Sequence, residues 1–244
     1  GLRRTDGVLL GMLPDVKIEL DVLTAALILC QEYGCFNQCS GTTLMGGFCG
    51  GVEGAVIEGI AKPSAGWMCY KGCPSTTGLG HVLGPTGRKI VVRPELSWGT
   101  SVIHQALNTK TNIICSQGAG SAAAPGTYEH LIDRAMVAMR NAIDGANMAI
   151  TRQIPPRPNA AQTPVEAAWQ FDVTNATMAA GIKRAKVEGI LRELAAEING
   201  IPVEPGPDVR TVYDWVHHQP LPAYRDRYLR AKERLSNLGL QFAE

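Results

Sequence analysis

The sequence predicts an α/β protein that corresponds to the C-terminal half of a TIM-type (β/α)8 barrel, with a C-terminal helical extension. Residues 112–120 combine a short apolar strand with a loop of small residues, and Thr127 then begins an amphipathic helix. Strand, loop and helix form the repeating unit of such a barrel, whose reactive groups lie on the loops after the strands. About three or four units can be recognised, whereas a closed barrel needs eight. We therefore expect half of a barrel.

Composition excludes several classes of partner. With 244 residues and 45% hydrophobic content, the chain can bury a core. The formal net charge is +1, and basic residues do not cluster with aromatic ones, so we expect neither nucleic acid nor a membrane as a partner. The longest apolar run, residues 23–30, is too short to span a bilayer.

Cysteine usage indicates the compartment. The chain has seven cysteines and no recognisable signal peptide, which is typical of a reducing compartment with free thiols. An odd number of cysteines also cannot pair completely within one chain. We therefore expect a cytoplasmic protein. Since the chain begins at Gly1 without an initiator Met, we expect a trimmed or processed product, or part of a longer polypeptide.

Residue usage divides the chain into two regions. Of the 27 glycines, 21 lie within residues 1–126, and all seven cysteines lie within residues 30–115. From Thr127 onward the sequence becomes helical and charged. We predict strand–helix units of a half-barrel that carry the site in residues 1–153. A C-terminal helical segment that packs on the barrel is predicted in residues 154–244.

Apolar periodicity and turn residues predict alternating helices and strands in the first region. The predicted helices cover residues 15–33, 52–61 and 97–108, and the predicted strands lie within residues 35–45 and 89–93. We expect Lys62-Pro63 to stop the second helix, because proline cannot donate the helical hydrogen bond. Residues 66–87 stay unassigned, because glycines and prolines interrupt every periodicity.

The second region has clearer helix signals. Residues 154–158, Ile-Pro-Pro-Arg-Pro, predict an extended linker. Residues 163–166, Thr-Pro-Val-Glu, have the spacing of a capping box with proline at the first helical position. A long helix is expected from there to residue 199, with a kink at Gly181. The last helix is expected over residues 222–237.

Four cysteines share a CxxxC spacing: Cys35 with Cys39, and Cys69 with Cys73. Four thiolates can hold a tetrahedral zinc ion or an iron–sulfur cluster, and the flanking glycines would let the backbone wrap around it. The alternative is that these cysteines fill a closely packed core, which is a common role of the free thiol. The spacing leaves both interpretations open.

The segment Ser116–Ser121, between the predicted strand and helix, is well placed for a site. Ser116, Gly118 and Gly120 are candidates for binding a ligand, because a hydroxyl group and closely approaching backbone amides can orient it. The helix start at Thr127 offers free N–H groups to an anion. The segment matches neither a P-loop nor the dinucleotide glycine motif, so a flexible connection is the alternative.

Histidines and one further cysteine complete the candidates. His81, in a glycine-rich stretch, is a candidate general base near neutral pH, although a lone histidine is more often a core or surface residue. His130 lies in a helical context and is a weaker candidate. Cys49, between two glycine pairs, has no neighbouring base in the sequence, so we expect it to pack rather than react.

Several stretches occur together in a recognisable order. They are residues 17–21 (Lys-Ile-Glu-Leu-Asp), 46–51 (Gly-Gly-Phe-Cys-Gly-Gly), the segment around His81, 208–212 (Asp-Val-Arg-Thr-Val) and a charged helix ending in Asn-Leu-Gly-Leu-Gln-Phe at 237–242. Together they resemble the monomethylamine:corrinoid methyltransferase family, whose members are about twice as long. The resemblance implies a TIM barrel that moves a methyl group from methylamine to the cobalt of a separate corrinoid protein. This chain would be the C-terminal half.

The resemblance also assigns positions. Gln117 falls where the family has a glutamine at a strand end. The two acidic positions of the family correspond to Leu9 and Ser40, and a family tyrosine corresponds to Ala119. The family's pyrrolysine lies upstream of the matched portion. Because three of the four polar positions near its ring are changed in this chain, we expect a pyrrolysine-independent relative.

The leading hypothesis is a subunit or fragment of a methylamine-methyltransferase-like enzyme. Gln117, Ser40 and His81 would orient the substrate, and the cysteine thiols could hold a metal that activates it. The expected partners are an N-terminal half or partner chain that completes the barrel, a corrinoid protein, and further copies in a homo-oligomer. The alternatives are a Cys/His metal-dependent lyase or hydrolase on the same barrel, or a non-catalytic scaffold subunit of a larger complex.

Overall fold

Strands and helices alternate through the first part of the chain. The computed structural model describes residues 8–11, 19–33, 37–69, 74–81, 94–121, 123–153, 161–199 and 206–243. The strands are β1 (Val8–Gly11), β2 (Asn37–Met45), β3 (Ser75–His81), β4 (Cys115–Ser121) and β5 (Met148–Gln153). The helices between them are α1 (Leu20–Tyr33), α2 (Val52–Cys69), α3 (Pro94–Lys110) and α4 (Tyr128–Asp144). The predicted mixture of helix and sheet is therefore confirmed.

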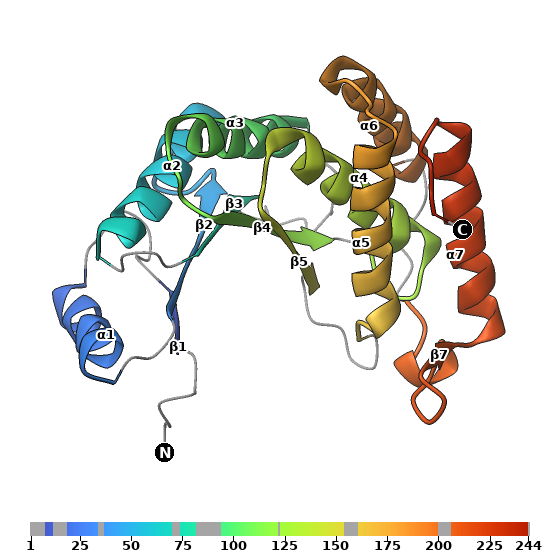
Figure 1. The fold of residues 1–244 in the computed structure, drawn as a ribbon, viewed down its shortest axis with the longest axis horizontal. Helices are drawn as coiled ribbons and strands as arrows, with labels where there is room; N and C mark the ends of the chain where they lie inside the picture. Colours follow the sequence, from blue (N-terminus) through green and yellow to red (C-terminus); the bar gives the residue numbers. More distant parts are fainter. Residues whose placement is uncertain are drawn as a thin grey trace. The chain divides into compact units, whose positions relative to one another are not determined.

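The strands form one sheet in the order β1-β2-β3-β4-β5. The pairings of β1 with β2, β2 with β3 and β3 with β4 are parallel. Figure 1 shows α2 and α3 on the same face of β2 and β3. Parallel strands joined by helices place all their carboxyl ends at one edge of the sheet, which is where such folds carry their sites.

The chain folds as two compact units. Unit 1 contains residues 1–86, 94–118 and 144–150, and unit 2 contains residues 87–93, 119–143 and 151–244. The division runs through β4 and β5, and it assigns most of α4 to the unit that contains the C-terminal helices. The boundary expected at residue 153 stays a prediction.

The core of unit 1 lies between the sheet and two helices. Its buried members are Val56, Ile103, Leu107, Ile113 and Cys115. A Cβ atom on Gly59 of α2 would lie 2.3 Å from Cδ1 of Ile103, so α2 and α3 pack closely at this glycine. Cys115 packs in this apolar core, which is a common position for a free cysteine.

Helix α2 continues through Pro63, which corrects the prediction that Lys62-Pro63 would stop it. Pro63 has no N–H group for the carbonyl oxygen of Gly59 one turn earlier. The hydroxyl of Thr77 on β3 donates to that carbonyl at 2.9 Å. A side chain from the sheet thus replaces the missing helical hydrogen bond, and the helix remains intact.

Helices dominate unit 2. Its further elements are α5 (Pro164–Ala179), α6 (Arg184–Asn199), the 3-10 helix η1 (Val209–Thr211), the strands β6 (Tyr213–Asp214) and β7 (Gln219–Pro220), and α7 (Pro222–Asn237). Trp169 of α5 is fully buried and donates its indole N–H to the carbonyl of Leu131 at 2.7 Å. The rings of Tyr228 and Phe242 pack against it, with centroids 5.0 and 5.9 Å away. These contacts join α4, α5 and α7 in one core.

Two helix predictions have different outcomes in unit 2. The capping box is confirmed, because the Thr163 hydroxyl accepts from the Val165 N–H while the Glu166 carboxylate accepts from the Thr163 N–H. The single helix predicted to kink at Gly181 is instead two helices, α5 and α6. Gly181 has φ +56°, a conformation that ends a helix and suits glycine. The last helix lies where it was predicted.

Strands β1, β3 and β5 were not predicted, and the predicted loop after residue 116 is wrong, because Cys115–Ser121 is the strand β4. Its small residues have low strand propensity. Pairing of Cys115, Ser116 and Gln117 with β3 overrides that propensity. The predicted strand at 89–93, the linker at 154–158, Cys35 and Cys73 lie outside the described residues. In the part that the structure describes, no helix has the length and hydropathy to cross a membrane.

Candidate functional site

The sheet register brings two of the predicted site positions near each other. Ser40 of β2 is in register with Thr76 of β3, which is in register with Ser116 of β4. Gln117 belongs to the next row, together with Thr77. The backbones of Ser40 and Gln117 are separated by two strand spacings, about 10 Å. Neighbouring rows alternate between the two faces of a sheet, so Ser40 and Gln117 belong to rows on opposite faces.

His81 lies in a different part of the sheet. It is the last residue of β3 and is in register with Met45, the last residue of β2. Ser40 precedes Met45 by five residues, which corresponds to about 16 Å along a strand. The register therefore does not bring the backbone of His81 close to Ser40. Only His81 of the three candidates lies at the carboxyl end of its strand.

The predicted ligand-binding residues lie in strand β4 rather than in a loop. Ser116 is fully buried, and its hydroxyl donates to the carbonyl oxygen of Ser75 on β3 at 3.4 Å. Gly118 and Gly120 continue the same strand. The Ser116 hydroxyl thus supports the sheet, and the roles of Ser116, Gly118 and Gly120 in ligand binding stay predictions.

The segment after β4 contains a buried histidine that the sequence interpretation ranked low. His130, in the first turn of α4, is fully buried, and its Nδ1 lies 3.0 Å from the carbonyl oxygen of Ala123. Burial and the nearby charge of Arg134 lower the pKa of His130 to about 3. The imidazole is therefore neutral near pH 7, with Nδ1–H donating to Ala123. Its Nε2 has no hydrogen-bond partner among the described residues.

The buried carboxylate of Glu166 binds the backbone of the same segment at Gly126. One oxygen of Glu166 accepts from the Tyr224 hydroxyl at 2.6 Å and from the Gly126 N–H at 3.3 Å. Burial, followed by the charge and hydrogen bond of Glu166, raises the pKa of Tyr224. Arg227 of α7 donates to the carbonyl of Gly126 at 2.6 Å. Side chains of the C-terminal helices therefore hold the backbone at Gly126, just before α4.

The connection after β2 carries a second polar cluster. The Cys49 thiol donates to the Glu58 carboxylate, and the Lys62 ammonium lies 2.6 Å from the other carboxylate oxygen. The side chains of Glu58 and Lys62 are both buried on α2. The sequence did not reveal this carboxylate beside the Cys49 thiol, and the packing role of Cys49 stays a prediction.

Two of the four candidate metal ligands, Cys39 and Cys69, lie in the described residues, near the amino ends of β2 and β3. Cys39 of β2 is in register with Ser75, the first residue of β3, and Cys69 is the last residue of α2, before the chain enters β3. Within the described ranges, no group of three or more histidine, cysteine or acidic side chains could hold a metal. Sites of this fold class form at the carboxyl ends of strands, so Cys39 and Cys69 lie away from the expected substrate position. Cys35 and Cys73 lie outside the described residues, so a zinc or iron–sulfur site at the four cysteines stays a prediction.

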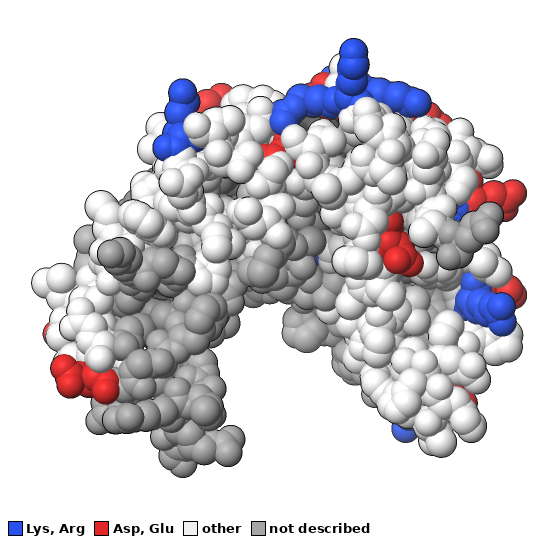
Figure 2. All heavy atoms as spheres, in the orientation of Figure 1, with Lys and Arg blue, Asp and Glu red and all other residues white. Residues whose placement is uncertain are grey.

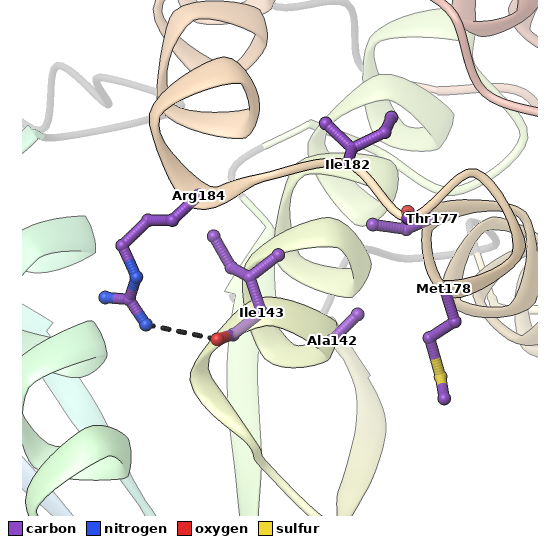
Figure 3. A pocket seen from close by; sticks show the side chains of 7 residues that line it. Ala142, Ile143, Thr177, Met178, Ile182 and Arg184 are labelled. Atoms are coloured by element: carbon purple, nitrogen blue, oxygen red, sulfur yellow. Dashed lines mark hydrogen bonds between the residues drawn. The ribbon is translucent and has the colours of Figure 1, made fainter.

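Described residues of unit 2 line two pockets. The pocket in Figure 3, about 250 Å³, lies beside the end of α4, where Arg184 donates to the carbonyl of Ile143 at 3.1 Å. The other, about 390 Å³, lies between α5 and α7 and is lined by Val165, Ala168, Gln219, Pro220, Arg225, Tyr228 and Leu229. Neither contains a predicted site residue.

The charged surface is mixed. On the face drawn in Figure 2, Lys and Arg gather most visibly over α6. That helix carries Arg184, Lys186 and Arg192, but also Glu188, Glu193 and Glu197. Arg234 of α7 binds two of these acids, at 2.6 Å to Glu193 and 2.9 Å to Glu197. The basic residues of α6 are therefore accompanied by an equal number of acids.

Sheet order, parallel register and helical connections define an α/β protein built from strand–helix units. No known family profile matches the sequence, and no curated protein matches it. Two solved structures of one enzyme have the same fold: the monomethylamine methyltransferase of Methanosarcina barkeri and its hydroxylamine complex. Each superposes with a TM-score of 0.81 at 19% sequence identity, covering 99% of this chain and 52% of the enzyme's chain. This chain thus has the fold of about half of that enzyme, in agreement with the resemblance found in the sequence.

Proposed function

We propose that this chain is one half of a methyltransferase-like α/β barrel enzyme, which moves a methyl group from a small methylated amine to a corrinoid protein. The observation that supports the proposal is the superposition of nearly the whole chain on half of a monomethylamine methyltransferase. A likeness that spans 99% of this chain leaves no part of it for a different fold. We further propose that it is the C-terminal half, that an N-terminal half or a partner chain completes the barrel, and that the complete enzyme is cytoplasmic.

The proposed reaction requires orientation more than acid–base strength. The methyl group leaves the amine nitrogen, and the amine must be protonated as it departs. The corrinoid on the partner protein supplies the nucleophile. Binding energy therefore contributes most to the rate when it aligns the methylated nitrogen with that nucleophile. The Gln117 amide and the Ser40 hydroxyl both donate and accept hydrogen bonds, so each is suited to orienting an amine.

A scaffold subunit is the second candidate function, and one observation favours it. Leu9 and Ser40, which correspond to acidic positions of the family in sequence, lie on adjacent paired strands, β1 and β2. Neither residue can carry a negative charge toward an amine. If both acids are needed for the chemistry, a chain without them serves only to hold a catalytic partner.

Methyl transfer by the purified complex distinguishes the two functions. The complex is mixed with methylamine and reduced cobalamin as the corrinoid probe, and methylation of cobalt is followed by visible absorbance. We expect one of the variants Gln117→Ala and Ser40→Ala, the one in the row that faces the amine, to slow the transfer by about 10- to 1,000-fold. Because the two residues belong to different rows, the variants test each row separately.

Ser236→Ala, an exposed change on α7, is the matched control and should leave the rate unchanged. Unchanged rates in both site variants would favour the scaffold. No transfer by the unmodified complex, with any of mono-, di- or trimethylamine, would contradict the proposed activity itself.

A further inference from the structure

A cavity of about 390 Å³ lies in unit 2, between the helices α5 and α7. Figure 1 shows these helices side by side. Glu166 bonds Tyr224 and, further along both helices, Asp172 bonds Tyr228, so α5 and α7 run in the same direction. Small-molecule sites in proteins have volumes of about 300–1,000 Å³. The cavity therefore has the size of a site for a small ligand.

Contacts within unit 2 hold the walls of this cavity in place. The Tyr228 hydroxyl donates to Asp172 at 2.7 Å, and the Tyr228 ring meets the buried Trp169 edge-on, with centroids 5.0 Å apart. Strand β7, which supplies another part of the wall, pairs with β6. Directly after β7, the Leu221 N–H donates to the carbonyl of the buried Val212 at 2.9 Å. A site with fixed walls loses little conformational entropy when it binds a ligand, which favours binding.

The described walls are mostly apolar. Tyr228 presents its ring, because its hydroxyl is bound to an acid of α5. Leu229 is 50% exposed, and Ala168 is exposed as well. The small side chain of Ala168 leaves the space beside α5 open. An apolar ligand would remove this surface from water, which is favourable. The other apolar residues of the wall are Val165 and Pro220.

Arg225 supplies the charge at the cavity. Among the described residues that line it, Arg225 alone is charged. Within the described part of the chain, its guanidinium has no hydrogen bond or ion pair. The other arginines of α7, Arg227, Arg230 and Arg234, bind a carbonyl, an aromatic ring and two carboxylates, respectively. A guanidinium binds a carboxylate through two parallel hydrogen bonds, so Arg225 is suited to hold the carboxylate of a ligand.

We propose that the cavity between α5 and α7 binds a small monocarboxylate with an apolar body, such as an arylalkanoate. The carboxylate lies against Arg225, and the apolar body lies against Ala168 and Leu229. One charged residue in the wall matches one carboxylate, because a second carboxylate would lie against apolar walls without a partner. The site goes beyond the proposed methyl transfer, whose candidate residues do not line the cavity.

Calorimetric titration of the purified protein with phenylbutyrate tests the site, and the neutral phenylbutyramide serves as the matched ligand. We expect the acid to bind about 3- to 10-fold more tightly than the amide, because only the acid pairs with Arg225. The titration contains neither methylamine nor corrinoid, so its result does not depend on the proposed function. Equal dissociation constants for acid and amide would overturn the proposal, as would the absence of saturable binding.

Variants of the protein locate the binding. Arg225→Gln should raise the dissociation constant of the acid to that of the amide and leave the amide's own value unchanged. Arg192→Gln, at an exposed arginine of α6 outside the cavity, is the control and should keep the full preference for the acid.

Ala168→Leu fills part of the cavity and should weaken the binding of both ligands by about 10-fold. Ala168 is exposed and leucine is a good helix former, so this variant keeps the fold, which far-ultraviolet circular dichroism checks. A preference for the acid that persists in Arg225→Gln would overturn the proposal, and so would unchanged binding in Ala168→Leu.

Discussion

His130 is fully buried at the start of α4, with Nδ1 3.0 Å from the carbonyl of Ala123. Its pKa is lowered to about 3, chiefly by burial, whereas an unfolded histidine titrates near 6.5. Between these values the unfolded chain binds a proton that the folded chain does not. Stability is therefore fully present above about pH 6.5 and falls as the pH drops toward 3.

We expect His130→Gln to remove much of this acid sensitivity. The unmodified protein should lose about 1.4 kcal/mol of unfolding free energy per pH unit below 6.5 through this residue. Glutamine does not titrate, and its amide can donate to Ala123 as the imidazole does. Urea unfolding at pH 7.5 and pH 5.0 measures the difference. His218→Asn is the control, because His218 is exposed and its φ of +54° is one that asparagine tolerates. An equal loss in the His130 variant would contradict the assignment.

At the residue scale, sequence predicted local hydrogen bonds but not distant ones. Thr163 and Glu166 are three residues apart, so the capping box was recognisable. The bond from Tyr224 to the same Glu166 spans 58 residues and has no local pattern. His130 was ranked low for a similar reason, because its burial depends on helices that lie far along the chain. A buried acid and a neutral histidine on either side of Gly126 therefore emerge only from the folded structure.

At the scale of single elements, α2 depends on a residue outside the helix. Pro63 leaves the Gly59 carbonyl without its helical donor, and the Thr77 hydroxyl replaces it at 2.9 Å. Both groups are buried, so loss of the donor leaves an unsatisfied carbonyl. The sequence rule that proline ends a helix was wrong here because the rule does not include donors from a neighbouring strand.

We predict that Thr77→Val lowers the free energy of unfolding by about 1–3 kcal/mol. Pro63→Ala restores an N–H group for Gly59, so the same Thr77→Val change should cost much less in that background. A double-mutant cycle by urea unfolding measures the coupling. If Thr77→Val costs the same with and without Pro63, the hydroxyl does not replace the missing helical bond.

Elements with strong periodicity or caps were predicted well, and strands of small residues were not. The last helix, residues 222–237, matches its prediction because proline, charge alternation and Gly239 mark its limits. Strand β4 was divided wrongly at Ser116, since Gly-Ala-Gly-Ser is typical of a loop. Its place between β3 and β5 in the sheet makes it a strand. Gly118 and Gly120 were predicted to bind a ligand as loop residues, and the structure places both in a strand.

At the scale of the whole molecule, the number of strand–helix units carried the most information. The sequence indicated too few units for a closed barrel, and the structure has one five-stranded sheet with this chain superposed on about half of a larger enzyme. Sequence could not show which apolar side chains stay exposed. In the structure they include Leu20, Val22 and Ile28 of α1.

The central claim is that this chain is half of a fold that an N-terminal half or a partner chain completes. Native mass spectrometry of the protein purified gently from its own cells tests it most directly. We predict that this sequence occurs either in a polypeptide of about twice 26.1 kDa or as a 26.1 kDa chain bound in equal number to a different chain of similar mass. A stable, folded monomer of 26.1 kDa would contradict the claim.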